Sequence, residues 1–205
     1  MTNPNQNLFG LVLAGGKSSR MGKDKSAIIY QDKPQLQVAY ELLVPLCSKV
    51  FISSRQGQEL IPPCQGYPRI DDDSEFEGKG PLSGILSAMN KYPDVSWLLL
   101  ACDLPFITPK TIEYLLANRN AHALATSYRS QFDGLPEPLC AVWEKGNFEK
   151  IHAFFLKGIH CPRKILIQSN AHVLAQQSEN ELNNINNLDE QSWAIEFFKK
   201  GKRNH

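Results

Sequence analysis

Short apolar runs alternate with segments of helical periodicity along the first 110 residues of the chain. Runs bounded by glycine, proline or polar residues predict strands at 8–13, 50–52, 67–70 and 97–101. Apolar residues that recur at three- and four-residue steps predict helices after Pro34, over 81–89 and after Pro109, each with a proline near its first turn. This alternation is typical of an α/β fold with a largely parallel sheet, whose ligands bind beyond the carboxyl ends of the strands.

The pattern is weaker after about residue 120. Candidate strands lie at 123–127, 139–143 and 171–174, and candidate helices at 148–156 and 189–198. Arg163 and Lys164 form a basic pair at an expected helix start. Because no internal repeat or low-complexity linker separates the two parts, we expect a single domain over 1–205.

The composition fits one globular domain and excludes several function classes. The chain has 205 residues, of which 42% are hydrophobic and 21% charged. The 22 Lys and Arg residues against 21 Asp and Glu give a net charge of +1, which argues against a dedicated partner of nucleic acid or of an anionic membrane. The longest purely apolar stretch, 97–102, is far shorter than the roughly 20 residues that a membrane span needs.

Two further features of the sequence predict a cytoplasmic protein. Residues 1–7 are polar and do not resemble a secretory signal. The five cysteines include no C-x-x-C pair, so they fit neither a zinc site nor a disulfide framework, and we expect them to be reduced.

The segment after the first strand has the chemistry of a polyphosphate site. Gly15 and Gly16 are followed by four cations within nine residues of a chain that is otherwise nearly neutral. Glycines let backbone amides approach phosphate oxygens, Arg20 can bind two oxygens at once, and Lys25 acts as a compact charge. The spacing matches neither the P-loop nor the dinucleotide fingerprint G-x-G-x-x-G, so a hydride-transfer enzyme is not expected.

The same segment resembles a known family. The run L-A-G-G-K-S-S-R-M-G-K-D-K at 13–25 is similar to the nucleotidyltransferases that build nucleotide-diphosphate conjugates, and most of all to the molybdenum cofactor guanylyltransferases. Three later motifs are also similar to this family, namely G-P-L-S-G at 80–84, C-D-L-P at 102–105 and N-I-N-N at 184–187. The resemblance implies a Rossmann-like nucleotidyltransferase fold, with a nucleotide-binding half at about 8–110 and an acceptor-substrate half at about 111–198.

The resemblance also implies roles for individual residues. Catalysis would rest on Arg20, Lys25 and Asp103. The nucleotide would contact Leu13, Ala14, Gly15, Gly16, Lys25, Ser53, Asp72, Gly80, Pro81, Leu82 and Asp103. Asp103 would hold Mg²⁺, with Asn186 as a second ligand.

The residues themselves bear on some of these roles. Asp103 directly follows a buried apolar run, so a strand would deliver its carboxylate, a hard oxygen ligand that suits Mg²⁺, to the carboxyl edge of the sheet. Asp72 lies in an acidic run, most of which we expect to be a solvated face. Ser53 stands where the family pattern resembles an asparagine. Ser54 and Arg55 receive no role.

The implied reaction joins two anions. The terminal phosphate of molybdopterin, with or without molybdenum, would attack the α-phosphate of GTP and release pyrophosphate. A phosphate monoester is already ionised at neutral pH and needs no base. This agrees with the sequence, in which no histidine is predicted to act as a base. Proteins that handle the molybdenum cofactor are expected partners. A related transferase that uses CTP or a sugar 1-phosphate, and a non-catalytic nucleotide-binding scaffold, remain alternatives.

Overall fold

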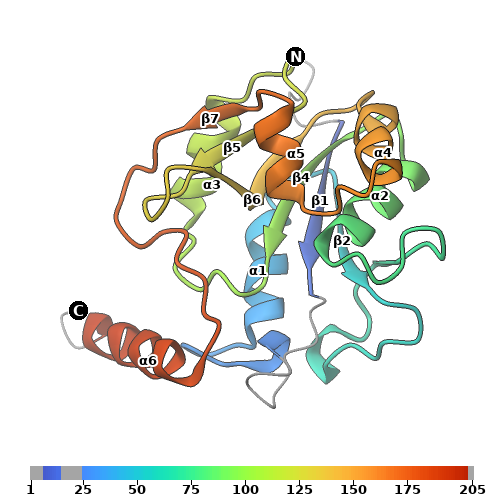
Figure 1. The fold of residues 1–205 in the computed structure, drawn as a ribbon. Coiled ribbons are helices and arrows are strands. Elements are labelled where there is room, and N and C mark those ends of the chain that lie inside the picture. Colours follow the sequence, from blue (N-terminus) through green and yellow to red (C-terminus); the bar gives the residue numbers. More distant parts are fainter. Residues whose placement is uncertain (1–6, 15–24, 203–205) are drawn as a thin grey trace.

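The computed structural model describes residues 7–14 and 25–202, which form one seven-stranded sheet covered by helices on both faces (Figure 1). The strand order is β3-β2-β1-β4-β6-β5-β7. The strands are β1 (Leu8–Leu13), β2 (Lys49–Ser54), β3 (Arg69–Asp71), β4 (Ser96–Ala101), β5 (Ala125–Arg129), β6 (Pro136–Trp143) and β7 (His172–Leu174).

The sheet is parallel except at β6. β1 pairs in parallel with β2 and β4, β2 with β3, and β5 with β7. β6 runs antiparallel to both β4 and β5. Only residues 130–135 connect β5 to β6, which suffices for a hairpin but not for the crossover that a parallel neighbour requires. The predicted α/β fold with a mostly parallel sheet is therefore confirmed.

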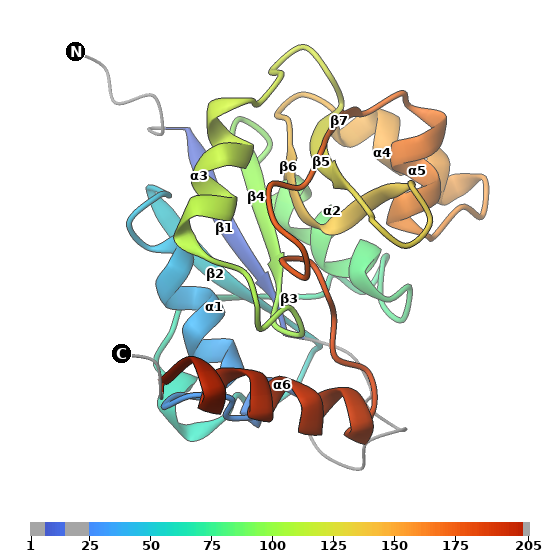
Figure 2. The same cartoon turned by 90° about the vertical axis from the view of Figure 1, so that its left-hand side faces the viewer.

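Helices bury both faces of the sheet, as Figure 2 shows in profile. The face that carries Leu8 and Val12 packs on α1 (Gln35–Leu43) and α3 (Pro109–Ala117). The face that carries Leu11 packs on α2 (Pro81–Lys91), α4 (Phe148–Leu156) and α5 (Pro162–Gln168). Alternate residues of β1 thus point into two different cores, which explains why its sequence is a continuous apolar run.

The last helix, α6 (Leu188–Lys202), lies apart from the two main layers, near the ends of β1 and β4 (Figures 1 and 2). Its Ala194 and Phe198 pack with Tyr30 and Phe106 in a third, smaller core. Two short 3-10 helices, Lys25–Ala27 and Pro62–Cys64, complete the fold. No helix in 7–14 and 25–202 is long and apolar enough to cross a membrane. The five cysteines are free thiols in this structure.

Candidate functional site

Four parallel strands end at one edge of the sheet and deliver the predicted site residues there. In Figure 1 the arrowheads of β1, β2 and β4 point toward this edge. Leu13 ends β1, Asp103 follows β4 by two residues, and Asp72 directly follows β3. The amide of Cys102 donates a 3.3 Å hydrogen bond to the carbonyl of Leu13. The loop that carries Asp103 is therefore tied to the end of β1.

A pocket of about 430 Å³ opens at this edge, between the ends of the strands and the start of α2. Its volume lies within the range of small-molecule sites. The pocket is lined by Leu13, Ser53, Ser54, Arg55, Asp72, Glu77, Gly78, Gly80, Pro81 and Ser83. The pocket thus brings together several of the residues predicted to bind nucleotide, and these come from distant parts of the sequence.

Two other predicted nucleotide contacts are buried and do not line this pocket. Leu82 is fully buried, with its side chain in the core under α2, so the structure does not present this residue to a ligand as predicted. Ala14 is also buried, at the end of β1. Gly15, Gly16 and Arg20 lie outside the described residues.

Two glycines of the G-P-L-S-G motif have clear local reasons. Gly80 precedes the first residue of α2 with φ at +64°, a conformation that side chains with a Cβ rarely adopt. At Gly84 a Cβ would collide with the hydroxyl of Ser53. Glycine there lets α2 approach the end of β2, which closes the pocket on that side.

Asp72 is the buried charge of the pocket. The residue is 8% exposed, and its carboxylate accepts no hydrogen bond from any residue in 7–14 or 25–202. Burial raises the pKa of Asp72 to about 6, and the negative charge of Glu77 adds to this rise while the positive charge of Arg55 opposes it. An unpartnered carboxyl of this kind is a candidate for ligand recognition.

A second cluster joins three residues that the sequence places far apart. Lys25 Nζ lies 2.8 Å from Asn186 Oδ1 and 3.1 Å from Asp103 Oδ2. The segment before α6 is held against the loop after β4, because the amide of Ile185 donates a 3.0 Å hydrogen bond to the carbonyl of Asp103. The predicted catalytic pair and the predicted second metal ligand therefore meet in one place.

Glu190 positions Asn186 and was missed by the sequence analysis. Its Oε2 accepts a 2.6 Å hydrogen bond from the amide of Asn186, and its Oε1 accepts a 2.7 Å bond from Asn187 Nδ2. Asn187 Oδ1 accepts a bond from the amide of Glu190 in return, at 2.9 Å. The spacing Asn-x-x-Glu before a helix is similar to a capping box, and this signal could have identified the pair.

The donor set around Asp103 is compatible with a hard divalent cation. Asp103 Oδ1 is buried and has no hydrogen-bond partner among the described residues. Together with Asn186 Oδ1 it offers oxygen ligands of the type that Mg²⁺ takes, while phosphates and water complete such a site. No group of three or more His, Cys, Asp or Glu residues that could hold a metal occurs in the described ranges.

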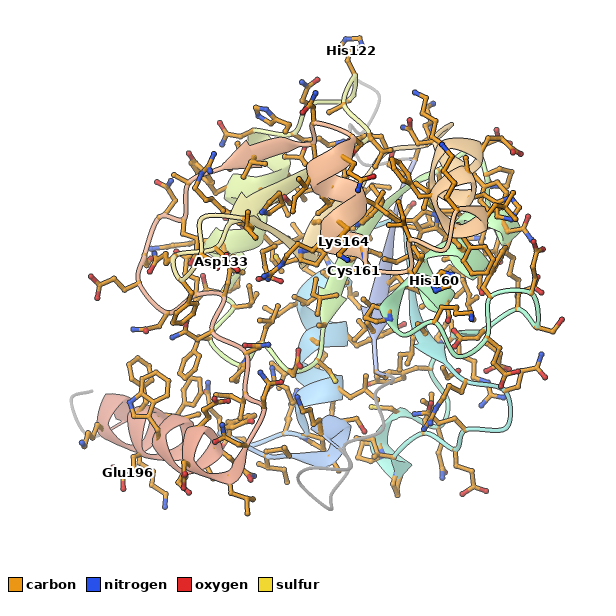
Figure 3. The ribbon with its side chains drawn as sticks, viewed as in Figure 1. His122, Asp133, His160, Cys161, Lys164 and Glu196 are labelled. Atoms are coloured by element: carbon orange, nitrogen blue, oxygen red, sulfur yellow. The ribbon has the colours of Figure 1, made fainter. Side chains whose placement is uncertain are left out.

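Residues outside the site have other partners. Figure 3 shows His122 at the end of the molecule opposite α6. His152 contacts Glu75 at 3.0 Å, and neither residue lines the pocket. Arg163 is bound to Asp133 at 2.9 Å and to Glu137 at 2.8 Å, so the expected basic pair is not simply exposed. No histidine within residues 25–202 lines the pocket or contacts Lys25.

Comparison with known proteins identifies the family of the chain. The family model described as the MobA-like NTP transferase domain matches residues 10–173. The chain belongs to this family. A bifunctional molybdenum cofactor biosynthesis protein of Synechocystis is 39% identical over 89% of the chain, and the chain spans only 52% of that protein.

Other members of the MobA-like family match along most of their own length. A probable molybdenum cofactor guanylyltransferase of Flavobacterium johnsoniae is 28% identical over 90% of this chain and 95% of its own. A probable molybdenum cofactor guanylyltransferase of Trichormus variabilis is 31% identical over 88% of this chain and 86% of its own.

Solved structures confirm the nucleotidyltransferase fold. The molybdopterin-guanine dinucleotide biosynthesis protein A of Archaeoglobus fulgidus superimposes with a TM-score of 0.74 at 22% identity, covering 94% of this chain and 99% of that one. A CMP-2-keto-3-deoxy-manno-octonic acid synthetase in complex with CTP gives 0.67 at 12% identity, with 96% and 100% covered.

Proposed function

We propose that this protein transfers GMP from GTP to molybdopterin, with or without molybdenum, and releases pyrophosphate. The observation that carries the proposal is the cluster of Lys25, Asp103 and Asn186 beside a nucleotide-sized pocket at one edge of the sheet. The names of the relatives, molybdenum cofactor guanylyltransferases, support the choice of substrates.

In this proposal the chain works by positioning and by charge. The pocket holds the nucleoside, and the backbone at Leu13 and Ala14 leads the phosphates toward Lys25 and Asp103. A unit charge pair at 4 Å is worth roughly 4 kcal/mol at an effective dielectric near 20, so fixed cations offset much of the repulsion between two phosphates. Lys25 supplies one such cation, and Arg20 is expected to supply another near the departing pyrophosphate.

Asp103 and Asn186 would hold Mg²⁺ in this scheme. The ion would neutralise phosphate charge when bound. Because Lys25 bonds to Asn186 Oδ1 and to the other oxygen of the Asp103 carboxylate, its ammonium would compete with a divalent ion bound by these two side chains. No residue is needed as a base, since the attacking phosphate monoester is ionised at neutral pH.

We further place the protein in the cytoplasm, and we propose that proteins which handle the molybdenum cofactor deliver the acceptor or receive the product. The absence of disulfides among its cysteines is compatible with a reducing compartment.

The test is release of pyrophosphate from GTP, CTP, ATP or UTP in the presence of Mg²⁺ and molybdopterin. We expect turnover with GTP, and its loss in Asp103→Ala without loss of folding. Glu196→Gln is the matched control, because Glu196 is an exposed carboxylate that points away from the molecule on α6 (Figure 3). Turnover in Asp103→Ala equal to that of the wild type would contradict the proposal, and preference for CTP would assign the protein to a related transferase.

A further inference from the structure

Arg55 stands at the edge of the nucleotide pocket with unused hydrogen-bond donors. It directly follows β2, and both its amide and its Nε donate to Gln58 Oε1, at 3.1 and 3.4 Å. These two bonds orient the guanidinium. Its Nη1 and Nη2 groups donate to no residue in 7–14 or 25–202, although Arg55 lines the pocket.

The pocket also contains an unused acceptor. Asp72 is nearly buried, and its carboxylate has no hydrogen-bond donor within the described part of the chain. Arg55 and Asp72 influence each other electrostatically, but no ion pair joins them. The pocket therefore combines a two-oxygen acceptor with a two-nitrogen donor, and neither group has a hydrogen-bond partner among residues 7–14 and 25–202.

Only one of the common bases matches such a pair. Guanine carries two donors, N1–H and the 2-amino group, next to two acceptors, O6 and N7. A carboxylate accepts two parallel hydrogen bonds, and a guanidinium donates two. Adenine and cytosine each lack one half of this pattern, and uracil has a single donor between two acceptors.

We propose that Arg55 and Asp72 select guanine as a pair, Asp72 by accepting from N1–H and the 2-amino group, and Arg55 by donating to O6 and N7. This inference rests on the proposed function and names the side chains that make the site specific for GTP. Glu77, which lines the same pocket, adds negative charge that acts on Asp72. Other bases would leave buried polar groups of the pocket unpaired, and this is how sites reject analogues strongly.

The test compares the dissociation constants of GTP and two analogues that each lack one group. Inosine triphosphate lacks the 2-amino group, and 7-deaza-GTP lacks the N7 acceptor. We expect the wild type to prefer GTP over each analogue by about tenfold or more. Asp72→Asn should lose the preference over inosine triphosphate and keep that over 7-deaza-GTP. Arg55→Met should show the opposite pattern.

Two further variants separate recognition from charge and from folding. Arg55→Lys keeps the charge without the planar pair of donors, so it should resemble Arg55→Met. Arg69→Met is the matched control, because Arg69 is an exposed cation on the adjacent strand β3 that does not line the pocket. It should keep both preferences.

The outcomes distinguish this inference from the proposed function. An Arg55→Met protein that binds all three nucleotides more weakly but keeps its preference for GTP over 7-deaza-GTP overturns the role of Arg55 in base selection. Equal affinity of the wild type for GTP and both analogues overturns the pair, while pyrophosphate release from GTP would leave the proposed function standing. Failure of the wild type to bind any of the nucleotides overturns both.

Discussion

At the scale of single residues, the arrangement of Lys25 bears directly on metal binding. Its ammonium contacts Asp103 Oδ2 and Asn186 Oδ1, so it is bound to both of the side chains proposed to hold Mg²⁺. The two side chains of the ion pair are only 22% and 19% exposed, so solvent screens the contact incompletely. An ammonium and a divalent ion cannot occupy the same position, and the two cations therefore compete.

Lys25→Met is expected to bind a free divalent ion more tightly while it loses turnover. Removal of the ammonium leaves the carboxylate of Asp103 without its cation. A metal ion can then bind the carboxylate without first displacing the lysine. Binding of Mn²⁺ without nucleotide, followed by electron paramagnetic resonance, measures the effect, and we expect a several-fold gain in affinity. Lys33→Met, at an exposed ion pair, is the control. Mn²⁺ affinity unchanged in Lys25→Met would refute the competition.

We expect Asp72 to make nucleotide binding dependent on pH. Its pKa is raised from 3.8 to about 6, mainly by burial, while Glu77 and Asp71 add to the rise and Arg55 opposes it. Only the ionised carboxylate accepts both guanine donors, so GTP affinity should fall as the pH is lowered through about 6. The limiting slope is tenfold for each pH unit below the pKa. Dissociation constants between pH 5 and 8 test this expectation.

The Asp72→Asn variant separates this titration from that of the triphosphate itself. The ratio of variant to wild-type affinity cancels every titration other than that of Asp72, and it should change around pH 6. The contribution of Asp72 to folding stability has the opposite dependence on pH. The folded protein binds a proton more readily than the unfolded chain between 3.8 and about 6, so stability contributed by Asp72 increases as the pH falls through this window. A ratio that stays constant from pH 5 to 8 would contradict the expected role.

At the scale of helices and strands, the sequence predicts best those elements that are buried on both faces. β1 and β4 are continuous apolar runs, and α1 and α3 each have a strong apolar face, so their positions are close to those observed. α5 is only seven residues long, and the sequence predicts where it begins but not its extent. β6 begins at Pro136, earlier than predicted. Its first residues pair only with β5, where prolines are tolerated because no ladder bond to β4 is lost.

The same contrast holds for the site. Asp103 and Lys25 follow strands or lie in a distinctive motif, so the sequence predicts them. Arg55 and Glu77 lie in loops, and their roles depend on which side chains the fold brings opposite them. Such pairings depend on long-range contacts, which a single sequence does not contain.

At the scale of the whole molecule, the two edges of the sheet have different tasks. The carboxyl edge carries Asp72 and Asp103, with groups left available for a ligand. The amino edge carries a closed polar network. Arg119 donates to both oxygens of Glu144 at 2.7 Å, and Ser96 Oγ lies 2.9 Å from Arg119 and 2.8 Å from Glu144. This network ties the end of α3 to the first residue of β4 and the end of β6.

Removal of one partner from this network is expected to destabilise the fold without affecting the site. Glu144 is only 2% exposed, so Arg119→Met leaves a buried carboxylate without its counter-ion, at a cost of about 3–5 kcal/mol in the free energy of unfolding. Replacing both partners, as in Arg119→Met with Glu144→Leu, should recover much of this loss, because no unpaired charge then remains.

The exposed pair of Lys33 and Glu41 provides the comparison, since Lys33→Met should cost no more than about 1 kcal/mol. Urea unfolding measures each value, and GTP affinity below the transition should match the wild type in all variants. If Arg119→Met proves as stable as Lys33→Met, the network does not stabilise the fold as expected. If Arg119→Met folds but binds GTP weakly, the amino edge does not act separately from the site.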